Sequence, residues 1–252
     1  MNKLPQITLA FWVMKICATT LGETAGDLLS MTLNIGYAMS SLLLISVFLL
    51  TLLGQLYSRR YHPAFYWVVI LATSTAGTTM SDFMDRTLGL GYATGSALLI
   101  GILLLTFAVW KYSEKSLNVE HITTRKGELF YWVAILFSNT LGTALGDYLA
   151  DDSGLGFAGG ALLIGSLIAA VVVLRFVTRI SPVALFWIAF VLTRPFGATL
   201  GDFLTKTHEQ GGMGFGTIGS SAILGAILLL MIIGASIAQR RAPATLVANP
   251  SA

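Results

Sequence analysis

Cysteine, charged residues and catalytic motifs are scarce in this chain of 252 residues. The single cysteine, Cys17, excludes an intramolecular disulfide, and no Cys/His spacing typical of a metal site is present. The chain contains no P-loop, no HExxH motif and no Ser/His/Asp set. Its Gly-x-Gly turns lack the strand–helix context of a nucleotide site. We therefore expect no enzymatic activity and no organic cofactor.

Only 11% of the residues are charged, whereas 55% are apolar. Several apolar runs approach or exceed the length needed to cross a bilayer, and one soluble core of this size could not bury all of them. We predict eight transmembrane helices, at residues 9–30, 37–57, 64–84, 93–112, 129–150, 157–178, 182–205 and 215–238.

Basic residues are unevenly divided between the two sets of connecting segments. One set holds Lys3, Arg59, Arg60, Lys111, Lys115, Arg125, Lys126, Arg175, Arg179, Arg240 and Arg241. The other set holds only Arg86 and Lys206. This asymmetry predicts that both termini lie in the cytoplasm. The net charge of +3 thus reflects topology, and we expect the lipid bilayer, not nucleic acid, as a partner.

One aspartate recurs in each quarter of the chain, within or at the end of a predicted span: Asp27, Asp82, Asp147 and Asp202. A tryptophan precedes each aspartate by fifteen residues and a glycine precedes it by five. A glycine–aromatic pair follows, at Gly36-Tyr37, Gly91-Tyr92, Gly156-Phe157 and, after a three-residue insertion, Gly214-Phe215. Such internal repetition decides the architecture before any other feature does.

The spacing of the aspartates indicates a nested duplication. Asp27 and Asp147 are 120 residues apart, and so are Asp82 and Asp202. The repeats run from about 9–57, 64–112, 129–178 and 182–238, with a polar linker at 113–128. Because each copy has two spans, all copies enter the membrane in the same direction. We predict one all-α transmembrane domain over residues 1–252, with pseudo-fourfold or nested twofold symmetry about the membrane normal.

Polar side chains precede each aspartate by eight, seven, four and three residues, offsets that share one helical face. Four such faces cannot contact lipid, so we expect them to surround a polar chamber. The predicted pathway-lining residues are Thr20, Thr24, Thr75, Thr79, Asn139, Thr140, Thr143 and Thr199.

Away from their ends, the predicted spans hold one more acid, Glu23, and two bases, Lys15 and Arg194. Crowded carboxylates require cations or protons in a low dielectric, and oxygen donors suit hard cations such as Mg²⁺, Mn²⁺ or Ca²⁺. The sequence predicts cation and proton binding by Glu23 and the four aspartates, which include the metal ligands Asp27, Asp82, Asp147 and Asp202.

Lys15 and Arg194 are the predicted charge-balancing groups, either as counter-ions that gate the site or as an ion pair that fixes helix register. Two further alternatives stay open. Each aspartate could cap a helix end, and the polar stripes could serve only to pair helices.

The repeated Gly-x-x-x-x-Asp signature and the later glycine–aromatic turn resemble a family of bacterial integral membrane proteins built from four copies of a short repeat of unknown function. The resemblance covers residues 9–238 and implies an eight-helix protein of the bacterial inner membrane. The fourth copy departs most, with Arg194-Pro195 and the longer turn. We predict a transporter or exporter of a small cation, with a divalent metal ion and proton coupling as the favoured case. A structural or regulatory membrane protein is the alternative, and the oligomeric state is left open.

Overall fold

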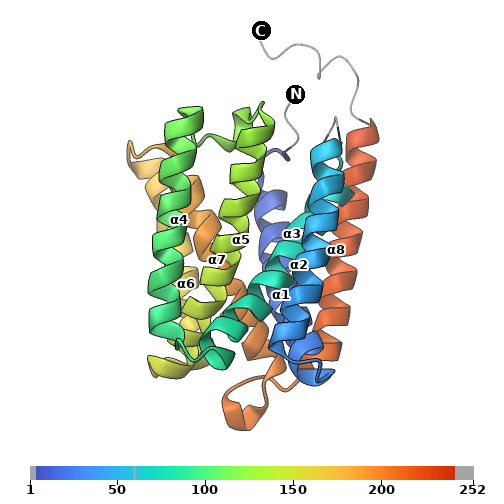
Figure 1. Cartoon of the computed structure of the whole chain (residues 1–252), viewed down its shortest axis with the longest axis vertical. Helices are drawn as coiled ribbons and strands as arrows, with labels where there is room; N and C mark the ends of the chain where they lie inside the picture. The colour runs from blue at the N-terminus through green and yellow to red at the C-terminus, as the bar shows by residue number, and fades with distance from the viewer. Residues whose placement is uncertain (1–3, 59–60, 242–252) are drawn as a thin grey trace.

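The protein is entirely helical in the part of the chain that its computed structural model describes, residues 4–58 and 61–241 (Figure 1). These residues contain no β-strand and form eight α-helices. The helices are α1 (Leu9–Asp27), α2 (Tyr37–Tyr57), α3 (Pro63–Asp82), α4 (Tyr92–Glu114), α5 (Arg125–Asp147), α6 (Gly156–Val177), α7 (Pro182–Thr205) and α8 (Gly216–Arg241). All except α1 and α3 are long and apolar enough to cross a membrane. The predicted all-α class is confirmed, and the six apolar helices are consistent with a multi-pass membrane protein.

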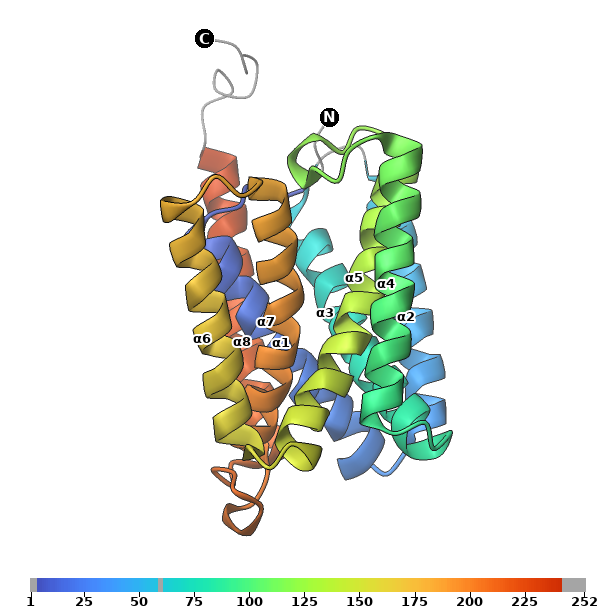
Figure 2. The same cartoon turned by 90° about the vertical axis from the view of Figure 1, so that its left-hand side faces the viewer.

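The odd-numbered helices form a closed ring, in which α1 packs against α3, α3 against α5, α5 against α7, and α7 against α1. Each even-numbered helix packs outside the ring, α2 on α3, α4 on α5, α6 on α7 and α8 on α1 (Figures 1 and 2). The outer helices expose large apolar side chains such as Leu50 and Leu230, as a lipid-facing surface requires. The polar faces of the ring helices are buried inside it.

Four recurring glycines explain how the ring helices approach so closely. A side-chain Cβ at Gly77 of α3 would lie 2.9 Å from the backbone of Asn139 on α5. A Cβ at Gly197 of α7 would lie 2.8 Å from the backbone of Thr19 on α1. Gly22 and Gly142 meet Ser74 and Arg194 in the same way. The helices run without interruption through these positions, so the glycines serve close crossing and do not break the helices.

Three of the ring helices change their winding immediately after the repeated aspartate. Helices α1, α3 and α5 end at Asp27, Asp82 and Asp147 and continue into π-helical turns of five residues each: η1 (Leu28–Thr32), η2 (Phe83–Thr87) and η4 (Tyr148–Asp152). Helix α7 has no such turn in its described residues. It runs past Asp202 to Thr205 and is followed by a longer connection that contains the 3₁₀ segment η5 (His208–Gln210). The fourth repeat therefore differs from the others at the end of its ring helix that carries the repeated aspartate.

Aromatic side chains fill the opposite end of the ring. Figure 1 shows that α1 begins and α8 ends at this end. Trp67 and Trp132 are 1% and 0% exposed, and the hydroxyls of Tyr66 and Tyr131 are 2.6 Å apart. The Trp187 indole N–H donates to the Leu117 carbonyl in the connection between α4 and α5. Trp67, Trp132 and Trp187 therefore pack in the bundle core, where their large rings fill the interior of the ring.

Candidate functional site

The four aspartates lie in one buried polar layer, in which two basic side chains join them in pairs, and Glu23 lies one helical turn before Asp27 on α1. Arg86 Nε lies 2.9 Å from Asp82 Oδ1, and Arg86 Nη2 lies 3.2 Å from Asp147 Oδ2. Lys206 Nζ lies 3.0 Å from Asp27 Oδ2 and 3.2 Å from Asp202 Oδ1. Each base thus joins the aspartates of two neighbouring ring helices. Because Asp27, Asp82 and Asp147 make no capping hydrogen bond, they do not serve as N-caps for the π-helical turns.

The sequence assigned Arg86 and Lys206 to exposed outer turns and missed their contacts with the aspartates. Each follows an aspartate by four residues, so both stand one helical turn beyond it on the same face. Burial opposes their charge, but the carboxylates outweigh that effect and raise the pKa of Arg86 and of Lys206 above their ordinary values. The i,i+4 spacing and the common offset of 120 residues between the two bases are the signals that could have identified them.

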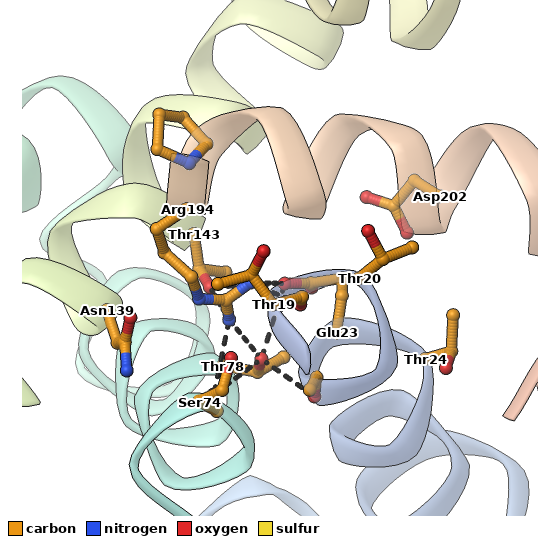
Figure 3. Close-up of polar contacts among 12 residues, drawn as sticks. Thr19, Thr20, Glu23, Thr24, Ser74, Thr78, Asn139, Thr143, Arg194 and Asp202 are labelled. Carbon is orange, nitrogen blue, oxygen red and sulfur yellow. Dashed lines mark hydrogen bonds and ion pairs between the residues drawn. The ribbon is translucent and has the colours of Figure 1, made fainter. Parts of the chain in front are cut away.

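Arg194 lies about two helical turns before Asp202 on α7 and is therefore nearer the aromatic end of the ring. Figure 3 shows its guanidinium group among Glu23, Thr78 and Thr143. Its side chain is fully buried, and its Nη1 lies 2.9 Å from Glu23 Oε2 of α1. The same guanidinium donates to the Ser74 carbonyl and Thr78 hydroxyl of α3, and at 2.7 Å to the Thr143 hydroxyl of α5. One side chain therefore contacts all three other ring helices.

The Arg194 guanidinium and Glu23 are also connected through two hydroxyl groups. Thr78 and Thr143 each accept from Arg194 and donate to Glu23 Oε2, at 3.3 and 3.2 Å respectively. This arrangement satisfies a buried charge pair with additional hydrogen bonds, which such a pair needs in a low dielectric.

Lys15 does not balance a carboxylate in the way that the sequence suggested. It is fully buried, and its Nζ donates to Asn139 Oδ1 at 3.5 Å and lies 4.1 Å from the Phe190 ring centroid. Among the described residues no acid lies within ion-pair distance of it. The aromatic face and the amide oxygen take the place of a carboxylate because Glu23 is already paired with Arg194.

The predicted pathway residues are all buried, but most of their hydroxyls point back to their own helix. The hydroxyl donates to a carbonyl three or four residues earlier in Thr20, Thr24, Thr75, Thr79, Thr140 and Thr199. Asn139 and Thr143 instead donate to groups on other ring helices, Thr73 of α3 and Glu23 of α1 respectively. The described conformation therefore uses only part of the polar stripe at the site.

Three carboxylates come close enough together to coordinate one ion. Glu23, Asp147 and Asp202 each offer an oxygen, and these oxygens lie within 4.8 Å of one another. They come from α1, α5 and α7. Asp202 Oδ1 is buried, and although Lys206 Nζ is 3.2 Å away, it makes no hydrogen bond of acceptable geometry. Asp27 and Asp82 stand outside this set, so the structure brings together two of the four predicted aspartate ligands.

Comparison with known proteins identifies the repeats. The family described as Repeat of Unknown Function (DUF347) matches this chain four times, at residues 10–61, 65–116, 130–181 and 185–241. The four matches confirm the four copies inferred from the aspartate spacing. No curated protein and no solved structure matches the chain.

Proposed function

We propose that this chain, which belongs to the DUF347 repeat family, is a cation transporter or exporter of the bacterial inner membrane. The observation that supports the proposal most directly is the convergence of Glu23, Asp147 and Asp202, with oxygens within 4.8 Å of one another. Carboxylates held at this separation on three different helices are suited to closing around one small ion.

The chemistry of the donors favours a hard divalent cation. The three groups supply only oxygen, as Mg²⁺, Mn²⁺ and Ca²⁺ prefer. In the described polar layer and next to it, five carboxylates are paired with three bases: Arg86, Arg194 and Lys206. If all are ionised, two negative charges remain unbalanced. One divalent ion or two protons would neutralise them, which provides a basis for coupling metal and proton movement.

Arg194 acts in this proposal as a tethered cation that closes the central axis. It bonds the same Glu23 oxygen that Thr78 and Thr143 contact, in the middle of the ring. An ion that takes Glu23 Oε2 as a ligand would compete with the guanidinium. Displacement of Arg194 would release its bonds to three helices together, so ion binding and opening of the ring are linked.

The proposal also covers the membrane topology of all eight helices. Helices α1 and α3 complete a ring with two membrane-type helices, α5 and α7, and we propose that all eight helices cross the bilayer with cytoplasmic termini. The 120-residue offset relates Asp82 to Asp202 and Arg86 to Lys206. It supports a nested twofold arrangement of four parallel repeats in a single domain.

Reconstitution into liposomes tests the proposal. Purified protein should take up divalent ions, and a pH gradient should change the rate. Asp147→Asn and Asp202→Asn should each lower the rate at least tenfold while folded yield stays normal. Asp152→Asn, at an exposed acid in the nearby turn, is the matched control and should keep wild-type uptake. Wild-type protein that moves no divalent or monovalent cation under any gradient would refute the transport function.

The second candidate is a structural or regulatory protein in which the polar network only joins helices. It is favoured by one observation, that each of the five carboxylates has a basic partner within 3.2 Å. In that case the two asparagine variants should lower thermal stability and folded yield. Any cation response should then follow the amount of folded protein.

A further inference from the structure

A cavity of about 840 Å³ opens on one side of the bundle, remote from the carboxylate layer. It lies between α1 and α6 with α7 as its floor, and residues 118–120 of the connection between α4 and α5 close one end. Helices α1, α6 and α7 are neighbours in Figure 2. Neither Glu23 nor any of the repeated aspartates lines the cavity, so its ligand is a separate question from the proposed cation.

The walls of the cavity are apolar and its mouth faces the surroundings of the bundle. Trp12, Ile168 and Phe186 are among the lining side chains. The rim includes Leu9, Val172 and Phe176, which are 80%, 52% and 82% exposed. Two of the three enclosing helices, α6 and α7, are long and apolar enough to cross a membrane. Water is a poor occupant for such a site, whereas a hydrocarbon chain would enter it directly from the bilayer.

The dimensions match one leaflet. The lining residues of α1 run from Leu9 to Ile16 and those of α7 from Pro182 to Thr193. At the rise of an α-helix these stretches are about 10 and 16 Å long. Half of a hydrocarbon core of about 30 Å is about 15 Å. The cavity therefore spans the depth of the acyl chains on the side where α1 begins and α8 ends.

A cationic side chain stands at the end of the cavity where a headgroup would lie. Arg175 lines the cavity in the last turn of α6 and is exposed, with no ion-pair partner among the described residues. Its position at the end of a membrane-type helix places the guanidinium at the level of lipid phosphates. The site is thus apolar along its length, and its charged lining residues are Arg175 on α6 and Glu120 in the connection between α4 and α5.

We propose that this cavity binds one acyl chain of an anionic phospholipid, whose phosphate contacts Arg175. The lipid fills the space between α1 and α6 and joins them on a side where α7 packs against both helices. The site does not depend on cation transport.

Trp12 provides a direct test because it lines the cavity and is half-buried, whereas Trp67, Trp110 and Trp132 are at most 1% exposed. The full chain is placed in mixed micelles with phosphatidylglycerol or phosphatidylcholine that carries brominated acyl chains. We expect brominated phosphatidylglycerol to quench tryptophan fluorescence at about fivefold lower mole fraction, the ratio given by about 1 kcal/mol per basic residue. Trp12→Phe should remove most of the quenching.

Two variants separate the headgroup from the chain. Arg175→Gln should abolish the preference for phosphatidylglycerol and keep the quenching, with Arg179→Gln, an exposed arginine outside the cavity, as its control. Ala189→Phe should fill the floor of the cavity and lower quenching by both lipids, with Leu230→Phe on the lipid face of α8 as its control. Equal quenching by both lipids, or quenching that survives Trp12→Phe or Ala189→Phe, would overturn the proposal. Neither result would affect the cation site.

Discussion

Arg194 and Glu23 form a fully buried ion pair, 2.9 Å apart, between residues separated by 171 positions in the chain. The two residues also mark where the halves of the chain differ. A shift of 120 residues aligns Arg194 with Ser74 and Glu23 with Thr143. The charge pair therefore stands where the other half has hydroxyl groups.

The first prediction concerns this ion pair. Arg194→Gln should destabilise the protein by about 3–5 kcal/mol, because it leaves the Glu23 carboxylate buried without its partner. The double variant Glu23→Thr with Arg194→Ser should recover much of this loss, because it removes both charges and introduces residues that the other half already carries. Thermal unfolding in detergent measures both. Strictly additive losses would show that the two residues are not coupled.

The second prediction concerns the ring glycines. Gly77→Leu should prevent α3 from reaching α5 and should abolish a monodisperse folded protein, as measured by size-exclusion chromatography. Even Gly77→Ala should cost about 1–3 kcal/mol through overpacking. Gly101→Leu is the control, because a Cβ at Gly101 on the outer face of α4 meets no atom within 4 Å. Equal effects at the two positions would contradict the close-crossing explanation.

The third prediction concerns alkaline pH. The folded protein raises the pKa of Lys206, and it therefore binds this proton more tightly than the unfolded chain. The stabilisation is complete below the unfolded pKa of about 10.4 and is lost as pH rises above it, by up to about 1.4 kcal/mol per pH unit. Thermal stability between pH 9 and 11 should fall less steeply in Lys206→Gln than in the wild type. Lys126→Gln, at an exposed lysine, should retain the wild-type slope.

The fourth prediction concerns competition between metal ions and protons. A divalent ion at Glu23, Asp147 and Asp202 should raise the thermal stability, by about 2.7 kcal/mol at a concentration one hundred times its Kd. Its affinity should weaken as pH falls, because protons bind the same oxygens. Titration of Mn²⁺ and Mg²⁺ by thermal shift at pH 6 and pH 8 measures this. Stabilisation that is unchanged in Asp202→Asn would place the ion elsewhere.

The fifth prediction concerns topology. The distribution of Lys and Arg predicts that a reporter fused after Gln239 is cytoplasmic and that a reporter inserted near Asp152 is external. Paired phosphatase and fluorescent-protein fusions distinguish the two sides. Reversed signals at both positions would invert the proposed orientation.

The repeated aspartates and glycines could be predicted from the sequence because each occupies the same place in every copy. The glycine recurs because each copy makes the same contact with the next ring helix. Gly22, Gly77, Gly142 and Gly197 each pack against the residue that precedes the aspartate of that next helix by eight positions. The repeated spacing between glycine and aspartate in the sequence thus corresponds to a repeated contact between adjacent ring helices.

The membership of the ion cluster could not be predicted, because it depends on the positions of the carboxylate oxygens in the folded ring. Arg86 contacts both Asp82 and Asp147, and Lys206 contacts both Asp27 and Asp202. Glu23, one helical turn deeper than Asp27, nevertheless approaches Asp147 and Asp202. Charge counting had treated Arg86 and Lys206 only as topological markers. Their side chains extend back by one helical turn to the aspartate four residues earlier. Counting the charges in the loops does not reveal this contact.

The closure of the ring has a consequence for biosynthesis. Helix α1 packs against α3, α7 and α8, and Glu23 finds its basic partner only in α7. At synthesis rates of about 5–20 residues per second, Glu23 leaves the ribosome roughly 10–35 seconds before Arg194 does. If α1 crosses the bilayer as proposed, the nascent chain must during that interval shield an acidic first helix from lipid without its final neighbours. The insertion machinery, or a provisional pairing of α1 with α3, has to retain α1 until the last quarter of the protein arrives.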